Sequence, residues 1–316
     1  MKKILLGILI IFVFACDSKS DVEKEIEKIP IEIEIVRFDK EFGMAKVSDL
    51  SELKKKFPEF FPKQYPDSIW IQKMQDTLQI ELFGEVLKKY PTEDILRDNF
   101  EQLFKHINYY FPKFNPPLVI TTTSDVDYRD KIILADSLLI INLDTYLGID
   151  HYFYQGIPNY IVENMKESQI IPDIASIYAQ KYTPRIQSRT FLAQMIYYGR
   201  ILYLKDMWLP ETPDNEKIGY TKEQFVWAEE NETEIWRNFV ENEYLFSTDP
   251  KLSTRFIVPA PFSKFYLEID NDTPGMIGRY IGWQIVRSFM KNNSLEQLLT
   301  LSEEEIFNKS KYKPKK

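Results

Sequence analysis

The stretch PPLVITTTSDVDYRDKIILADSLLIINLDTYLG, residues 116–148, decides the fold. It contains β-branched runs at 118–123, 131–134 and 138–142, which are separated by short segments that contain Asp. Runs of this length and composition are typical of strands, and Asp-rich connections are typical of turns. The stretch therefore predicts a small antiparallel meander near the middle of the chain.

A further strand is expected before this stretch. From Ile29 to Ile35, isoleucine alternates with Pro or Glu. A period of two is typical of a half-buried strand. The sheet is thus expected to be antiparallel or mixed, and the folded part of the chain to begin near residue 29.

Helical spacing of apolar residues dominates the rest of the sequence. It is clearest between Leu96 and Tyr110, where the apolar side chains fall on one face. No linker composition follows residue 30, so residues 29–316 are expected to form a single, mostly helical α+β domain. We further expect a helix at 48–57, one or two helices over 67–90, and helices at 188–208, 221–246, 273–290 and 294–307.

Three glycines share one face of the helix expected at 273–290. Gly275, Gly278 and Gly282 follow each other at spacings of three and four. A glycine inside a helix costs roughly 1 kcal/mol relative to alanine. We therefore expect this face to pack closely against a neighbouring helix. Ser294 and Gln297 have the spacing of a capping box and are expected to begin the last helix.

The N-terminus has the pattern of an export signal. Two lysines precede an apolar run over residues 4–15, which is too short for a retained membrane span of roughly 20 residues. The run ends in VFAC, residues 13–16, which resembles the bacterial lipobox. Residues 1–15 are thus expected to be a lipoprotein signal peptide and Cys16 the lipidation site, carrying fatty chains such as palmitate.

Cys16 is the only cysteine of the chain, and an ordinary signal peptide with a chance cysteine is the alternative. A single free thiol in an exported protein tends to form unwanted disulfides. The presence of one cysteine therefore favours acylation of Cys16. Two or more acyl chains would then give a stable anchor. Residues 16–28 contain no aromatic residue and many charges, and are expected to be a flexible spacer.

The balance of charge restricts the possible partners. The net charge is −8, and nucleic acid and anionic lipid headgroups both require clustered positive charge. We therefore expect no nucleic-acid partner, and contact with the bilayer only through acylated Cys16. The five lysines within residues 309–316 are interpreted as a solvated tail.

The sequence offers few residues for catalysis. Its two histidines, His106 and His151, are too far apart in sequence to form a zinc-binding helix motif, and no G-x-S-x-G or phosphate-binding glycine loop is present. His106 lies on an amphipathic helix and is expected to be packed. His151, after Asp150, is the better candidate for catalysis. We expect no catalytic, cofactor-binding or metal-binding residues.

Two segments leave alternatives open. Asp125, Asp127 and Asp130 could bind calcium, but the loop lacks the Gly and the terminal Glu of an EF-hand, which favours a solvated turn. Residues 255–270 contain Pro259 and Pro261, which stiffen an apolar loop. That loop either docks a partner or covers the core.

Several stretches resemble one known family. They include QMIYYGRILYLKDMWLP at 194–210 and RFIVPAPFSKFYLEIDNDTPGMIGRYIGWQIVRSFM at 255–290, and in order they cover nearly the whole mature chain. They are similar to the gliding motility lipoprotein GldB of Bacteroidota. The resemblance also includes IEIEIVRFD at 31–39, DTYLGIDHYFY at 144–154, GYTKEQFVWAEENETEIW at 219–236 and SKYKPKK at 310–316.

The resemblance implies a lipid-anchored cell-envelope component that faces the periplasm and is required for gliding. It implies no assigned enzymatic reaction, so the chain is expected to act as a non-catalytic binding or scaffold protein. The implied partners are other lipoproteins and membrane proteins of the gliding and associated secretion apparatus. Whether the anchor lies in the inner or the outer membrane stays open.

A more distant similarity to zinc peptidases is also implied. Their HExxH helix would fall near residues 191–203, which here read FLAQMIYYGRILY, with Gln194 and no histidine. The expected outcome is a peptidase-like scaffold without its metal. The alternative is a hydrolase of wall or surface polymers that uses carboxylates or His151.

Overall fold

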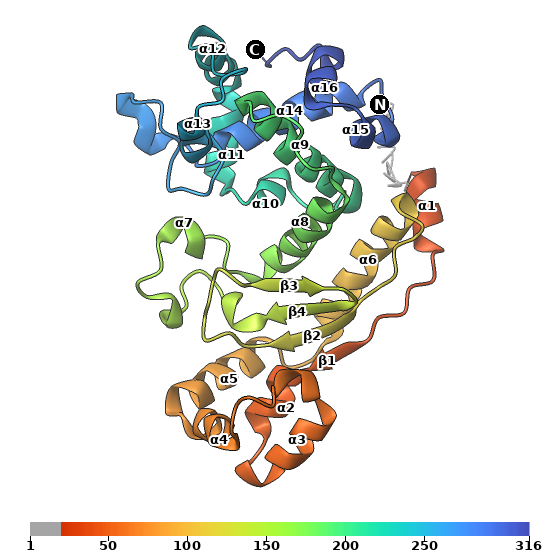
Figure 1. Cartoon of the computed structure of the whole chain (residues 1–316), viewed down its shortest axis with the longest axis vertical. Helices are drawn as coiled ribbons and strands as arrows, with labels where there is room; N and C mark the ends of the chain where they lie inside the picture. Colours follow the sequence, from red (N-terminus) through yellow and green to blue (C-terminus); the bar gives the residue numbers. More distant parts are fainter. Residues whose placement is uncertain (1–19, 316) are drawn as a thin grey trace, which may run out of the picture.

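The computed structural model describes residues 20–315, in which helices surround a small sheet (Figure 1). The four strands have the spatial order β1-β2-β4-β3. The expected α+β fold, rich in helices and with a small mixed sheet, is confirmed. The strands are β1 (Ile35–Arg37), β2 (Leu118–Thr122), β3 (Ile132–Ala135) and β4 (Leu138–Asn142).

The antiparallel meander expected for residues 116–148 is confirmed for β3 and β4 and is wrong for β2. β4 lies between β2 and β3, parallel to β2 and antiparallel to β3. The residues of β3 alternate between half-buried and exposed, as suits an edge strand, whereas β4 is a continuous apolar run that suits a strand covered on both faces. Asp136, in a left-handed conformation with φ 49°, reverses the chain between them.

β1 is shorter than the alternating pattern of residues 29–35 predicts. Its pairing with β2 is parallel and begins with Ile35 opposite Val119. The amide of Val119 donates to the carbonyl oxygen of Glu34. Residues 116 and 117 are both Pro, which cannot donate to a ladder. The ladder therefore ends here, although the preceding isoleucines still pack against the core.

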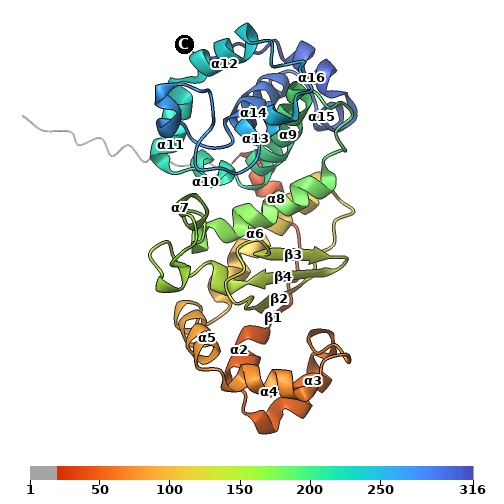
Figure 2. The same ribbon diagram turned by 60° about the vertical axis from the view of Figure 1, so that its left-hand side comes forward.

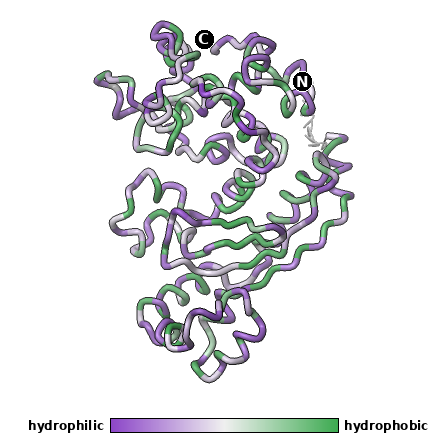
Figure 3. Tube along the Cα trace, viewed as in Figure 1, coloured by the Kyte–Doolittle hydropathy of each residue, from purple (hydrophilic) through white to green (hydrophobic). Residues whose placement is uncertain are grey.

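Different helices cover the two faces of the sheet (Figures 1 and 2). Ile120 faces a cluster rich in phenylalanine from α2, α3 and α5, whereas Val119 and Leu139 belong to the core that includes α6 and α8. Figure 3 shows hydrophobic residues along the central strands between these layers. The helices are α2 (Phe38–Met44), α3 (Leu50–Lys56), α4 (Asp67–Gln75), α5 (Thr77–Lys89), α6 (Asp94–Tyr110) and α8 (Ile170–Tyr182).

The C-terminal part of the chain is a second helical layer around α9 and α14. Gly199 of α9 and Gly282 of α14 bring the two backbones into contact, so the packing expected of the glycine face is confirmed for Gly282. A separate apolar cluster fills this layer. The helices not yet given are α7 (Asn159–Val162), α9 (Phe191–Trp208), α10 (Asp214–Ile218), α11 (Lys222–Glu230), α12 (Glu232–Glu241), α13 (Pro250–Phe256), α14 (Ile277–Met290), α15 (Leu295–Thr300) and α16 (Glu303–Ser310).

Several expected helices differ from the structure in where they begin, end or are interrupted. α14 begins at Ile277 rather than at residue 273, because Met276 adopts a left-handed conformation with φ 58°. The helix expected at 221–246 is interrupted at Asn231, and the one expected at 294–307 is interrupted after Thr300. The capping box of the last segment, at Ser294, is confirmed.

The spacer expected for residues 16–28 is wrong over residues 21–27, which form α1 (Asp21–Glu27). Ser20 caps this helix by accepting a hydrogen bond from the amide of Glu23. Ile26 is fully buried, and α1 packs on α6. Burial of Ile26 therefore helps to order a segment whose composition is otherwise that of a solvated linker.

Candidate binding pocket

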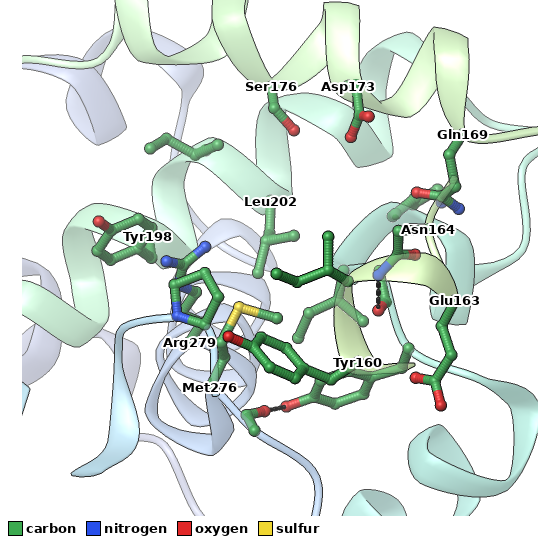
Figure 4. A pocket seen from close by; sticks show the side chains of 18 of the residues that line it. Tyr160, Glu163, Asn164, Gln169, Asp173, Ser176, Tyr198, Leu202, Met276 and Arg279 are labelled. Carbon is green, nitrogen blue, oxygen red and sulfur yellow. Dashed lines mark hydrogen bonds between the residues drawn. The ribbon is translucent and has the colours of Figure 1, made fainter. Parts of the chain in front are cut away.

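A cavity of about 430 Å³ lies between α8 of the sheet layer, the middle of α9, the end of α10 and the start of α14 (Figure 4). This volume is within the range of ligand sites in proteins. Its wall combines aromatic and aliphatic side chains with a few charged ones, so both apolar burial and ionic contacts are available to a ligand. The apolar wall includes Tyr160, Tyr198, Leu202, Ile218, Pro259 and Met276.

Two hydrogen bonds join the elements of the wall. Gly219 ends α10 in a left-handed conformation with φ 80°, which glycine adopts without strain, and its carbonyl oxygen accepts from the Asn164 side chain at 2.9 Å. The hydroxyl of Tyr220 donates to the carbonyl oxygen of Gly275 at 2.5 Å. The loop after α7 and the start of α14 are thus fixed to the same turn.

Two of the lysines in the lining are neutralised by carboxylates. Lys131, before β3, pairs with Asp173 of α8, which also accepts a hydrogen bond from the hydroxyl of Tyr146 at 2.9 Å. Lys217 of α10 pairs with Asp206 at 3.2 Å and with Asp214 at 3.1 Å. Neither lysine therefore leaves an unbalanced charge in the cavity.

Lys205 of α9 lies in a different environment. It is 4% exposed, and its ammonium group donates to the hydroxyl of Ser176 at 2.9 Å and to the carbonyl oxygen of Lys217. Burial lowers the pKa of Lys205 to about 7, although the charge of Asp173 opposes this shift. This lysine is therefore partly neutral at physiological pH.

Lys205 is expected to make the protein more stable as the pH rises from 7 to 9. Since its pKa in the folded protein lies below the ordinary value of 10.5, the unfolded chain binds more protons in this range. The free energy of unfolding should then rise by at most about 1.4 kcal/mol per pH unit. Urea unfolding at pH 7, 8 and 9 measures this slope. Lys205→Met should flatten it, whereas Lys251→Met, at an exposed position, should not; equal slopes in all three proteins would contradict the assignment.

Arg279 of α14 is the second cation without a carboxylate. Its Nε donates to the carbonyl oxygen of Ile257 at 2.6 Å, and its guanidinium lies 4.0 Å from the centre of the Tyr198 ring. Burial lowers the pKa of Arg279, which still remains charged at neutral pH. The cavity therefore combines an aromatic wall with an uncompensated guanidinium, an arrangement that suits an anion.

His151, the sequence candidate for catalysis, lies outside this cavity. Its Nε2 is 3.3 Å from the carboxylate of Glu85, and its Nδ1 accepts from the amide of Phe153 at 3.4 Å. The hydrogen bond from His151 holds the pKa of Glu85 below its ordinary value. Asp150 is exposed. The histidine thus caps the short turn that follows it and joins this turn to α5.

His106 is packed, as its position on an amphipathic helix predicts. It is 4% exposed, its Nδ1 lies 2.8 Å from the carbonyl oxygen of Gln102, and its Nε2 lies 3.2 Å from the carboxylate of Glu23. This contact also fixes α1 against α6. Each histidine therefore contacts a glutamate of another helix, Glu23 of α1 for His106 and Glu85 of α5 for His151.

The three aspartates of the 123–131 loop do not converge. Asp125 pairs with Lys73 at 3.0 Å, and Asp127 pairs with Arg129 at 2.8 Å. A fourth carboxylate, Asp144, organises the loop by accepting from backbone amides, and burial raises its pKa to about 6. Within residues 20–315, no group of three or more His, Cys, Asp or Glu is arranged to hold a metal ion.

Two further segments from the sequence analysis can be placed. Gln194, in the first turn of α9, donates to the carbonyl oxygen of Arg189 at 3.5 Å. The loop of residues 255–270 covers the core through Ile257 and also contributes Pro259 to the pocket wall, while Tyr266 stays 73% exposed. Its apolar residues are thus divided between the core and the surface. Cys16 and the expected signal peptide of residues 1–15 lie outside the described residues.

The sequence analysis did not identify Lys205 or Arg279. The available signal was a single cation inside a strongly apolar helix, in ILYLKDMWL at 201–209 and in GMIGRYIGW at 275–283. Such a charge is costly to bury unless it meets a partner. The helical pattern alone does not indicate that both cations face the same cavity.

Comparisons with known proteins agree with the resemblance seen in the sequence. Searches of curated proteins and of solved structures found no match. Over the described part of the chain, every helix is too short or too polar to span a membrane. The family model described as "Gliding motility protein GldB" matches residues 19–314, and the chain therefore belongs to this gliding motility family.

Proposed function

We propose that this protein is a lipid-anchored component of the cell envelope that supports gliding motility as a non-catalytic binding protein. The observation that carries the proposal is the family match over residues 19–314. The lipobox-like VFAC sequence supports a lipid anchor at Cys16, with the folded body facing the periplasm. Its partners would be other lipoproteins and membrane proteins of the gliding and associated secretion apparatus.

The start of α1 limits how far the body can stand from the membrane. Only residues 17–20 separate Cys16 from Asp21, the first residue of the helix. A fully extended chain spans at most about 3.6 Å per residue. With an anchor at Cys16, the first residue of α1 would therefore stay within about 20 Å of the bilayer surface. This short reach favours partners next to the membrane.

The pocket is consistent with binding rather than covalent catalysis. Its lining, as far as the structure describes it, includes neither His nor Cys. Lys205 is 4% exposed, and its ammonium group is held by hydrogen bonds to Ser176 and to the carbonyl oxygen of Lys217, so it is poorly placed to attack a substrate. Recognition of a ligand is the activity that these side chains support best.

Replacing Cys16 with alanine should remove the anchor and stop gliding. Cells that lack the wild-type gene would receive either this variant or Ser18→Ala as a matched control next to the lipobox. Radiolabelled palmitate should enter the control protein and not Cys16→Ala, and only the control should restore spreading on agar. Palmitate labelling of Cys16→Ala, or full spreading by the deletion strain, would refute the proposal.

A further inference from the structure

We propose that the pocket between α8, α9 and α14 binds a carboxylate-bearing ligand with an apolar or aromatic body, and that Arg279 holds the carboxylate. The inference goes beyond the proposed function and depends on the pocket alone. It would apply equally to an unanchored protein. Its first basis is that Arg279 has no carboxylate partner among the described residues, unlike Arg37, Arg200 and Arg287; the half-buried Arg255, which also has none, lies outside the pocket.

Three other interior arginines face carboxylates. Arg37 pairs with Asp39 at 2.6 Å, and Arg200 pairs with Glu303 at 2.9 Å. In the same way, Arg287 of α14 is 2.7 Å from Asp206. This is the usual solution to the cost of burying a guanidinium.

Arg279 has no such partner in the described chain. A guanidinium carries five N–H donors, and the structure gives a protein acceptor only for that of Nε, the carbonyl oxygen of Ile257. Tyr198 covers one flat face of the group, which leaves the edge with the terminal nitrogens for a ligand. Figure 4 shows this guanidinium beside the ring of Tyr198 within the pocket.

A carboxylate fits this arrangement better than other groups. The planar fork of arginine matches the two oxygens of a carboxylate in a bidentate contact. One uncompensated guanidinium balances one negative charge. Glu163 also lines the pocket and would repel a second charge on the ligand, which disfavours a phosphate dianion.

The rest of the wall determines the body of the ligand. Tyr160, Leu202 and Met276 lie around the cavity in Figure 4, and apolar surface of this kind gains roughly 25 cal/mol for each Å² that it removes from water. A hydrophobic acid, or the C-terminal residue of a peptide, provides both parts. The shared chemistry is a free carboxylate next to an apolar group.

The test measures binding to the full chain, purified in detergent, by isothermal titration calorimetry. The probe is N-acetylphenylalanine, and its neutral amide is the comparison. The acid should bind saturably at millimolar concentration or below, and the amide about 10- to 100-fold more weakly, as expected when a charged hydrogen-bonded pair is lost. 3-Phenylpropionate, which lacks the peptide group, distinguishes the two sources. Equal binding of both acids indicates a small hydrophobic acid, and preference for the acetylated amino acid indicates a peptide end.

The variants separate recognition from packing. Arg279→Gln should reduce the affinity for the acid to that for the amide, and Arg279→Lys should give an intermediate value because it keeps the charge without the fork. Arg237→Gln, at an exposed arginine of α12, is the matched control and should bind as wild type. If Arg279→Gln does not fold, the comparison of acid with amide on Arg279→Lys still decides. Equal affinity for acid and amide, no saturable binding, or unchanged binding by Arg279→Gln would overturn the proposal.

Discussion

Replacing Gly282 with alanine is expected to destabilise the protein strongly. A Cβ atom at this position would lie 1.8 Å from the carbonyl oxygen of Met195, a backbone atom of α9 that cannot rotate away. The contact is reciprocal, because a Cβ atom on Gly199 would lie 2.3 Å from the carbonyl oxygen of Gly282. Alanine would therefore force α9 and α14 apart along the centre of the C-terminal layer.

The expected loss is large compared with the stability of an ordinary domain. Overpacking by added methyl groups costs typically about 1–3 kcal/mol, and a clash with rigid backbone exceeds the usual case. We expect at least about 3 kcal/mol of the roughly 5–15 kcal/mol that holds a typical domain folded. Urea unfolding followed by circular dichroism measures the difference.

Gly84 provides the matched control. It also lies inside a helix, α5, but a Cβ atom there would meet nothing within 4 Å. Gly84→Ala should therefore leave the structure intact and raise the free energy of unfolding by up to about 1 kcal/mol through helix propensity. Similar stability of Gly282→Ala and wild type would show that the two helices can separate without cost.

The contact at Gly282 also shows how much of the helix packing can be predicted from the sequence. Glycines at spacings of three and four on a predicted helix indicated a close approach, and that approach exists. The sequence could not name the neighbouring helix, because nothing in α14 itself identifies the facing residue Gly199. Apolar periodicity predicts which face of a helix is buried, but it does not predict which helix packs against that face.

The sheet was predictable in composition and not in topology. The runs at 118–123 and 138–142 are strands within a residue or so, yet their pairing is parallel. The β-branched character that identifies a strand is the same in both orientations. The choice depends on which strand fills the centre of the sheet, a property of the whole layer. α8 was not among the helices expected by residue range, and its Pro172 lies in the first turn, where proline is tolerated.

The pocket was the least predictable feature. Its two cations without a carboxylate partner come from α9 and α14, and its apolar wall includes the loop of residues 255–270 and residues near α7 and α10. Sequence reasoning selects residues whose chemistry is recognisable alone, such as His151 and the aspartates at 125–130. Lys205 and Arg279 become notable only once their lack of a carboxylate partner is visible, which requires the fold.

Glu303→Ala should be the second strongly destabilising substitution. Glu303 begins α16 and is 3% exposed, and it pairs at 2.9 Å with Arg200 of α9, which is 1% exposed. Burial lowers the pKa of Arg200, and the charge of Glu303 opposes that shift. Removing the carboxylate leaves a buried guanidinium whose remaining contact is the carbonyl oxygen of Leu301 at 2.5 Å. Breaking a buried pair in this way costs about 3–5 kcal/mol.

A double variant shows whether the cost comes from the uncompensated charge or from lost packing. Arg200→Met combined with Glu303→Met removes both charges and keeps similar volume, so it should recover most of the stability, as buried pairs replaced by apolar residues often do. The exposed pair Glu234–Arg237 is the control, and Glu234→Ala should change the free energy of unfolding by about 0.5 kcal/mol or less. If the double variant is as unstable as Glu303→Ala, packing of α16 on α9 is responsible instead. The ion pair would then orient α16 on α9 without adding to the free energy of unfolding.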